Sequence, residues 1–143
     1  MAIITLTSDF GLSDYYVGVI KGAMLCQNPD LNIVDISHNV KTYDIVQASF
    51  IIKNSYRAFP KGTIHVVSVN NFINTAKSFI TIKHKDYYFI GPDNGIFSPF
   101  LESFQAVELT NQDVFLKPVS ATFHGRDIFS PVAAWIANGK PFE

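Results

Sequence analysis

Short runs of β-branched residues alternate along this chain with longer segments in which apolar residues recur every three or four positions. The first pattern is typical of buried strands and the second of amphipathic helices. Strands are predicted over residues 3–7, 32–36, 63–69, 78–83, 87–91 and 106–109, and helices over residues 15–27, 44–59, 94–103 and 126–138. The alternation favours an α/β fold of three layers, in which a mostly parallel twisted sheet carries helices on both faces.

Polar residues, proline and glycine mark the ends of the predicted elements. Ser13 or Asp14 is the expected N-cap of the first helix, and Pro60 ends the second helix. The tripeptide "HKD" at residues 84–86 indicates a hairpin, and Gly139 closes the last helix. No repeat, low-complexity tract or linker interrupts the pattern, so we expect the chain to form a single domain.

Composition then narrows the classes of function. The 143 residues are 48% hydrophobic, which suits one compact core, and their net charge is −1. That balance lacks the basic excess typical of proteins that bind nucleic acid or anionic membranes, so small molecules or protein partners are the better candidates. Cys26 is the only cysteine, which excludes an intrachain disulfide and favours a reducing compartment. With neither a signal peptide nor an apolar run of membrane length, we expect a cytoplasmic protein.

Candidate chemistry lies just after the predicted strands, because ligands of open α/β sheets bind beyond the carboxyl ends of their strands. Asp9 follows the first strand, His38 and Tyr43 follow the second, and the polar loop 70–77 follows the third. Each place also has a purely structural explanation. An aspartate at such a turn often bonds local backbone N–H groups, and a lone loop histidine is usually structural or solvated.

A further candidate is the segment "SATFHGRDIFSPVAAWIANG", residues 120–139, which sets His124, Arg126 and Asp127 at the start of a predicted helix. An aspartate in the first turn of a helix can simply complement the helix dipole. Common motifs are missing elsewhere: the chain contains no G-x-S-x-G elbow, no Walker phosphate loop and no G-x-G-x-x-G fingerprint. The four histidines have no partners at metal-ligand spacing, so no metal site is predicted.

Six motifs in order give the chain a specific resemblance. They are "TLTSDFGLSDYYVGVIKGAML", "NPDLNIVDISHNV", "FPKGTIHVV", "YYFIGPDNGIFS", "VELTN" and "ATFHGRDIFSPVAAWIANG". Together they resemble the S-adenosylmethionine (SAM) hydroxide adenosyltransferases, relatives of the SAM-dependent fluorinase and chlorinase. The resemblance implies an N-terminal α/β domain, here residues 1–143, followed in the family by a C-terminal β-barrel. It also implies a homotrimer in which SAM lies between the first domain of one subunit and the second domain of its neighbour.

The same resemblance assigns substrate-binding residues by position. Asp9 matches the carboxylate that accepts hydrogen bonds from both ribose hydroxyls. Asp14 would lie near the methionine ammonium group, and Tyr43 falls where the halogenases place an aromatic wall. Phe123 and Gly125 belong to the segment that lines the nucleophile pocket. SAM is the substrate in this family, and no cofactor is implied.

The catalytic set departs from the family pattern. Hydrolytic members use an Asp-Arg-His set to position the attacking water, and His124 matches the histidine. An ungapped alignment of the third strand puts Asn70 at the aspartate position and Lys77 at the arginine position. An amide cannot act as a base, and lysine lacks the planar fork of arginine, so the change predicts slow or altered chemistry.

The implied reaction is attack of water or hydroxide at C5′ of SAM, which yields adenosine and L-methionine. The alternative is a domain without catalysis that binds adenosine or SAM, or that serves oligomerisation. Halide as the nucleophile is a third possibility. It is disfavoured because His124 occupies the position of the hydrolytic members.

Overall fold

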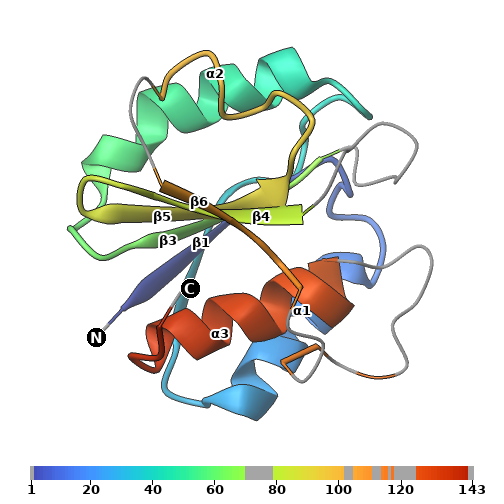
Figure 1. Ribbon diagram of the computed structural model, residues 1–143. Helices are drawn as coiled ribbons and strands as arrows, with labels where there is room; N and C mark the ends of the chain where they lie inside the picture. Colours follow the sequence, from blue (N-terminus) through green and yellow to red (C-terminus); the bar gives the residue numbers. More distant parts are fainter. Residues whose placement is uncertain are drawn as a thin grey trace.

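The computed structural model describes residues 2–69, 79–101, 105–110, 114–115, 117 and 125–141. Figure 1 shows one sheet between two helical layers, which confirms the three-layer α/β prediction. The strands are β1 (Ile3–Ser8), β2 (Asn32–Ser37), β3 (Ile64–Ser68), β4 (Phe79–His84), β5 (Tyr87–Pro92) and β6 (Gln105–Glu108). The helices are α1 (Tyr16–Gln27), α2 (Ile45–Ser55) and α3 (Ser130–Ala137), with a 3₁₀ turn over Tyr56–Ala58 and a π turn over Gly125–Phe129.

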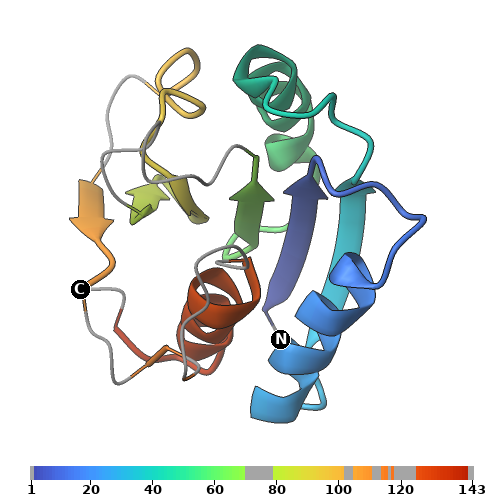
Figure 2. The same cartoon turned by 90° about the vertical axis from the view of Figure 1, so that its right-hand side faces the viewer.

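The sheet has the strand order β2-β1-β3-β5-β4-β6. β2, β1, β3 and β5 pair in parallel, while β4 runs antiparallel to both β5 and β6, so β4 alone is reversed. The arrows of β1, β2 and β3 point the same way in Figure 2. From β1 the chain goes outward through α1 to β2, then crosses back through α2 to β3. This reversal makes the carboxyl ends of β1 and β3 the topological switch point.

Each face of the sheet has its own hydrophobic core. Ile4, Ile64 and Phe129 belong to the cluster on the face of α1 and α3, whereas Val67 and Ile52 belong to the cluster on the α2 face. β1 and β3 are buried on both faces, as expected for central parallel strands. Full burial of one such apolar side chain contributes about 1.5–3 kcal/mol relative to exposure. The two cores therefore hold the central strands rigidly under the loops at their carboxyl ends.

Two sequence predictions about helices are wrong. Residues 94–101 form bends and turns instead of the start of a helix, because Gly95 has φ +95° and Pro99 follows. The Asn94 side chain also bonds away from a helix, since its Nδ2 donates to the Val69 carbonyl at 3.1 Å. The N-cap of α1 is Tyr15, without a side-chain cap bond, and not Ser13 or Asp14.

The last helix begins in an unusual way. The predicted helix over residues 126–138 exists, but its first part is the π turn Gly125–Phe129, and the α-helical part starts at Ser130. Pro131 lies in the first turn of α3, where its missing N–H costs nothing. Short π segments inside helices are rare and are often found at functional sites. None of the described helices is both long and apolar enough to span a bilayer.

Candidate functional site

The loops that follow β1 and β2 lie against each other at the carboxyl edge of the sheet (Figure 2). The Gly11 N–H donates to the His38 carbonyl at 2.6 Å, and the Val40 N–H donates to the Ser8 carbonyl at 3.3 Å. Gly11 has φ +73°, a backbone conformation that glycine adopts at little cost. The loop after β1, which lies at the topological switch point, is therefore joined to the loop after β2 by backbone hydrogen bonds.

Asp9 is the half-buried carboxylate at the centre of this arrangement. Its Oδ2 accepts a hydrogen bond from the Tyr43 N–H at 3.0 Å. Oδ1 makes no hydrogen bond to any residue that the structure describes. Asp9 thus has one oxygen that anchors the neighbouring loop and one oxygen that can accept a hydroxyl from a ligand.

Tyr43 carries strain at the same place. It has φ +63°, which is uncommon for a residue with a large side chain and costs on the order of 1–3 kcal/mol. The residue is 53% exposed. Asp9 and Tyr43 are 34 positions apart in the sequence, and the fold brings them into contact through the Tyr43 N–H. Strained residues of this kind cluster at ligand-binding loops, which favours a functional role for this edge.

Two other predicted site residues, Asp14 and Gly125, belong to the part of the chain that the structure describes. Asp14 is exposed, and its Oδ1 accepts from the N–H of the next residue, Tyr15, at 2.7 Å. No hydrogen bond links Asp14 to Asp9 or Tyr43 in the described part of the chain. Gly125 opens the π turn that precedes α3. The remaining predicted residues lie outside the described residues: Asn70, Lys77, Phe123 and His124.

A polar network beside Asp9 was missed at the sequence level; it is buried at Ser8 and His38 and reaches solvent at Asp35 and Lys21. The Ser8 Oγ lies 2.6 Å from the His38 Nδ1, and the His38 Nε2 lies 2.9 Å from the Asp35 Oδ1. The Lys21 ammonium donates to the Asp35 Oδ2 at 2.7 Å. Burial would raise the pKa of Asp35, but hydrogen bonds from Lys21 and His38 outweigh burial and hold that pKa below its ordinary value. The sequence shows polar residues at these two strand ends, "SD" at residues 8–9 and "DISH" at residues 35–38, but it does not show that they meet.

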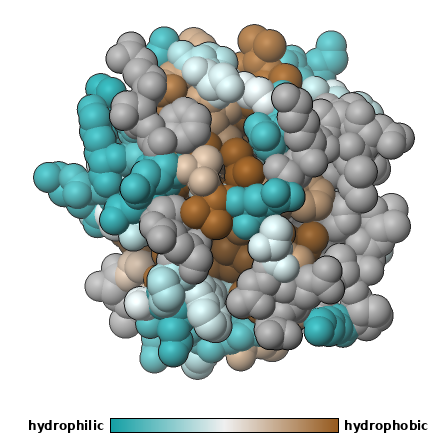
Figure 3. Space-filling view, viewed as in Figure 1, coloured by the Kyte–Doolittle hydropathy of each residue, from teal (hydrophilic) through white to brown (hydrophobic). Residues whose placement is uncertain are grey.

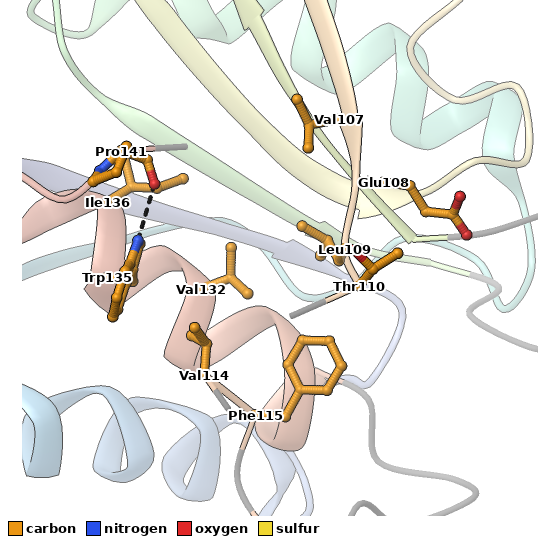
Figure 4. Close-up of a pocket in the computed structure, with 10 residues that line it drawn as sticks. All are labelled: Val107, Glu108, Leu109, Thr110, Val114, Phe115, Val132, Trp135, Ile136 and Pro141. Atoms are coloured by element: carbon orange, nitrogen blue, oxygen red, sulfur yellow. Dashed lines mark hydrogen bonds between the residues drawn. The ribbon is translucent and has the colours of Figure 1, made fainter. Parts of the chain in front are cut away.

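A separate hollow opens at the far edge of the sheet (Figure 4). Figure 3 shows hydrophobic atoms in a depression near the middle of this face. The hollow has a volume of about 120 Å³ and lies between β6 and α3. Its walls are mainly apolar and include Val107, Leu109, Phe115, Val132 and Ile136.

This hollow is not part of the Asp9 site. Its strand, β6, is four positions from β1 in the sheet, which corresponds to roughly 19 Å at about 4.8 Å per strand. The Trp135 indole N–H at its rim already donates to the Pro141 carbonyl at 2.9 Å. Few polar groups converge on the hollow, so it lacks the means to orient a charged nucleoside. Among the described residues, no three His, Cys, Asp or Glu side chains are placed to hold a metal ion.

Comparison with known proteins identifies relatives along almost the whole chain. Residues 4–143 match the family described as "SAM hydroxide adenosyltransferase N-terminal domain". The (R)-S-adenosyl-L-methionine hydrolase of Methanocaldococcus jannaschii is 36% identical over 139 residues, which cover 94% of this chain and 52% of that protein. The hydrolase of the same name from Salinispora tropica is 35% identical over 96% of this chain and 54% of its own length.

More distant relatives have a different activity in their names. The fluorinase of Nocardia brasiliensis is 26% identical over 99% of this chain and 56% of that protein. Among solved structures, an uncharacterized conserved protein from Thermotoga maritima superposes with a TM-score of 0.89 at 36% identity, over 98% of this chain and 56% of that one. The chain thus spans about half the length of the relatives it matches.

Proposed function

This chain belongs to the family of SAM hydroxide adenosyltransferase N-terminal domains, and on that premise we propose that it forms the ribose-binding half of a SAM hydrolase. The proposed reaction splits SAM into adenosine and L-methionine. Relatives at 31–36% identity are named SAM hydrolases, which supports SAM as the substrate. The fluorinases are less similar, at 24–26% identity, which favours water over halide as the nucleophile.

The chemistry asks for positioning more than for strong acid or base catalysis. An oxygen of water or hydroxide forms a bond to C5′ while the C5′–S bond breaks, and its electron pair leaves with sulfur. Methionine departs as a neutral thioether, and the proton of the attacking water passes to solvent or to a nearby base. Because the sulfonium is already a good leaving group, the site has to hold C5′ in line with a partly desolvated nucleophile. No cofactor enters this balance.

The arrangement of Asp9 is the observation that carries the proposal. Its carboxylate lies at the switch point of the sheet and keeps Oδ1 available beside an oxygen fixed by the Tyr43 N–H. Such a carboxylate suits recognition of two vicinal ribose hydroxyls, each donating to it. Asp14, Tyr43, Phe123 and Gly125 are proposed as further substrate contacts on the family resemblance.

The nucleophile side of the site is proposed from sequence position alone. His124, Asn70 and Lys77 would surround the attacking water, with Asn70 orienting it in place of a charged base. We further propose a homotrimer in the cytoplasm, in which a C-terminal β-barrel of a neighbouring subunit covers the adenine. The chain itself spans only about half the length of each relative.

The second candidate is a domain that binds adenosine or SAM without cleaving SAM, or that serves assembly alone. The replacement of a carboxylate by Asn70 and of an arginine by Lys77 in the predicted catalytic set favours it. In the binding form of this alternative the Asp9 side of the pocket would still bind a ribose, whereas a domain that serves assembly alone would not.

One experiment separates the candidates. The full gene product is incubated with SAM, and adenosine and methionine are measured by chromatography, with calorimetry for adenosine binding. We expect adenosine and methionine in equal amounts. For Asp9→Asn we expect the Kd of adenosine to rise on the order of 10- to 100-fold, because an amide has one acceptor oxygen instead of two and carries no charge. If the wild-type protein binds adenosine but forms no products, the second candidate is supported. It is also supported if products appear only in the Asn70→Asp, Lys77→Arg double variant. No heat with adenosine leaves only an assembly role.

A further inference from the structure

Hydrogen-bond chemistry fixes the direction of the network beside Asp9. An ionised carboxylate can only accept, so the His38 Nε2 carries the proton and donates to Asp35 at 2.9 Å. In a neutral ring the Nδ1 is then an acceptor, and the Ser8 hydroxyl donates to it at 2.6 Å. The Ser8 oxygen in turn accepts from the Phe10 N–H at 3.3 Å. The chain of bonds therefore runs from α1 through the end of β2 to the turn that contains Asp9.

His38 holds that turn from two sides. Its ring bonds Ser8, the residue before Asp9, and its carbonyl accepts from Gly11, two residues after Asp9, at 2.6 Å. The Ser8 oxygen closes a small turn over Asp9 through the Phe10 N–H. Asp9 is thus bracketed by contacts to a single residue of the neighbouring loop. Movement of His38 would move the carboxylate.

The hydrogen-bonded set of Ser8, His38 and Asp35 has the residue types of a catalytic triad, but its geometry argues against nucleophilic catalysis. Ser8 and His38 are only 2% and 3% exposed, so a substrate carbon cannot reach the Ser8 oxygen. The hydroxyl proton is already donated to His38, and one lone pair of the oxygen already accepts from the Phe10 N–H. The network is built to fix atoms in place.

We propose that His38 is a positioning residue for Asp9, held in orientation by Asp35 and Lys21 and acting through Ser8 and Gly11. The inference rests on the proposed function, in which Asp9 binds the ribose. It adds a requirement that the family match does not state: ribose affinity depends on a buried histidine that touches no substrate. A displacement of the carboxylate by about 1 Å can cost on the order of 100-fold in efficiency.

A matched control, His65, lies on β3, on the other side of β1. His65 is also buried, and its Nδ1 lies 2.6 Å from the hydroxyl of Thr5 on β1, as His38 does with Ser8. Thr5 is four residues from Asp9, however, and the His65 ring packs among Tyr56 and other aromatics of the α2-side core. Truncation of either histidine removes a buried hydroxyl–imidazole bond, but only the His38 truncation should disturb Asp9.

The experiment compares His38→Ala with His65→Ala in the full gene product. Calorimetry measures the Kd of adenosine, steady-state turnover measures KM and kcat for SAM, and amide hydrogen exchange reports Gly11 and Tyr43. For His38→Ala we expect a Kd and a KM raised at least tenfold, kcat changed less than threefold, and faster exchange at both amides. A ribose contact made equally in ground and transition states acts on KM in this way. For His65→Ala we expect less than a threefold change in Kd.

Conservative variants test the direction of the network. Asn places its amide near the Nδ1 position and can keep the Ser8 bond, whereas Gln reaches toward Asp35. His38→Asn should therefore recover most of the adenosine affinity, and His38→Gln should not. Ser8→Ala added to His38→Ala should cost little more, because both remove the same bond.

Several outcomes would overturn the proposal. One is an adenosine Kd for His38→Ala within threefold of the wild type, or no larger a change than in His65→Ala. Another is equal rescue by Asn and Gln. If the wild type neither binds adenosine nor cleaves SAM, the proposed function fails. Unchanged exchange at Gly11 and Tyr43 in His38→Ala would then separately refute the positioning role.

Discussion

His65 makes the stability of this protein depend on pH in a way that can be calculated. Its side chain is fully buried in the α2-side core, with Tyr56, Tyr87 and Phe89 around the ring. Burial lowers the pKa of His65 to about 4, and the backbone of Tyr56 opposes only part of that effect. The ordinary pKa of a histidine is about 6.5, so the unfolded chain binds a proton that the folded protein refuses.

The sign and size follow from that difference. Between pH 6.5 and pH 4 the unfolded state holds more protons, so stability is complete above pH 6.5 and falls as the pH drops through this window. The full loss is on the order of 3 kcal/mol at about 1.4 kcal/mol per pKa unit. Roughly 2 kcal/mol of it should be lost between pH 7 and pH 5. The lowered pKa of Asp35 has no part in this range, because its protonation begins at lower pH.

Urea unfolding at several pH values measures the effect directly. His65→Asn is the control, since asparagine keeps a polar group near the Nδ1 position that faces Thr5 but does not titrate. We expect the wild-type free energy of unfolding to fall by about 2 kcal/mol from pH 7 to pH 5, relative to the variant. An NMR titration of the His65 ring should give a value near 4. A parallel pH dependence in both proteins, or a ring that titrates near 6.5, would refute the reasoning.

Four further substitutions give simpler predictions for urea unfolding. Gly91→Ala should destabilise the protein by about 1–3 kcal/mol, because the added Cβ would lie 2.7 Å from the Val67 carbonyl oxygen. Gly22→Ala in α1 has open space around it and should stabilise the protein by about 0.5–1 kcal/mol. Equal effects of the two substitutions would contradict the close approach at Gly91. Lys85→Gly should stabilise by up to about 1 kcal/mol, since Lys85 has φ +54° in the β4–β5 turn. Asp44→Ala should cost about 1 kcal/mol, because the Asp44 carboxylate accepts from the N–H of the third residue of α2; no change would show that the cap is dispensable.

Regular patterns in the sequence predicted most of the fold. The central strands and α1, α2 and α3 were found because their apolar periodicity agrees with their burial on one or both faces of the sheet. The prediction of a helix over residues 94–103 was wrong because Ile96, Phe97 and Leu101 have helical spacing but pack into the α2-side core from a segment of bends and turns. The backbone conformation there is set by the positive φ of Gly95 and by the side-chain hydrogen bonds of Asn94. The spacing of apolar residues carries no information about either feature.

The candidate site was predictable only in part. Asp9 and Tyr43 followed from strand ends and family resemblance, and the structure adds the hydrogen bond between them. The role proposed for His38 could not be foreseen, because a lone histidine after a strand gives no sign of its partners. Which strand lies beside β1, and in which register, decides that Ser8 meets His38. That information belongs to the sheet and not to any local pattern.

The π turn at Gly125–Phe129 gives the chain a means of change by single-residue deletion. A π turn holds one residue more than an α turn, and one residue corresponds to about 100° of rotation about the helix axis. Removing that residue would leave α3 seated in its core while turning the direction of the incoming chain by more than a quarter of a circle. Such a change of length would re-aim whatever precedes the turn, provided that Ile128 and Phe129, which belong to the turn, keep their places in the buried core.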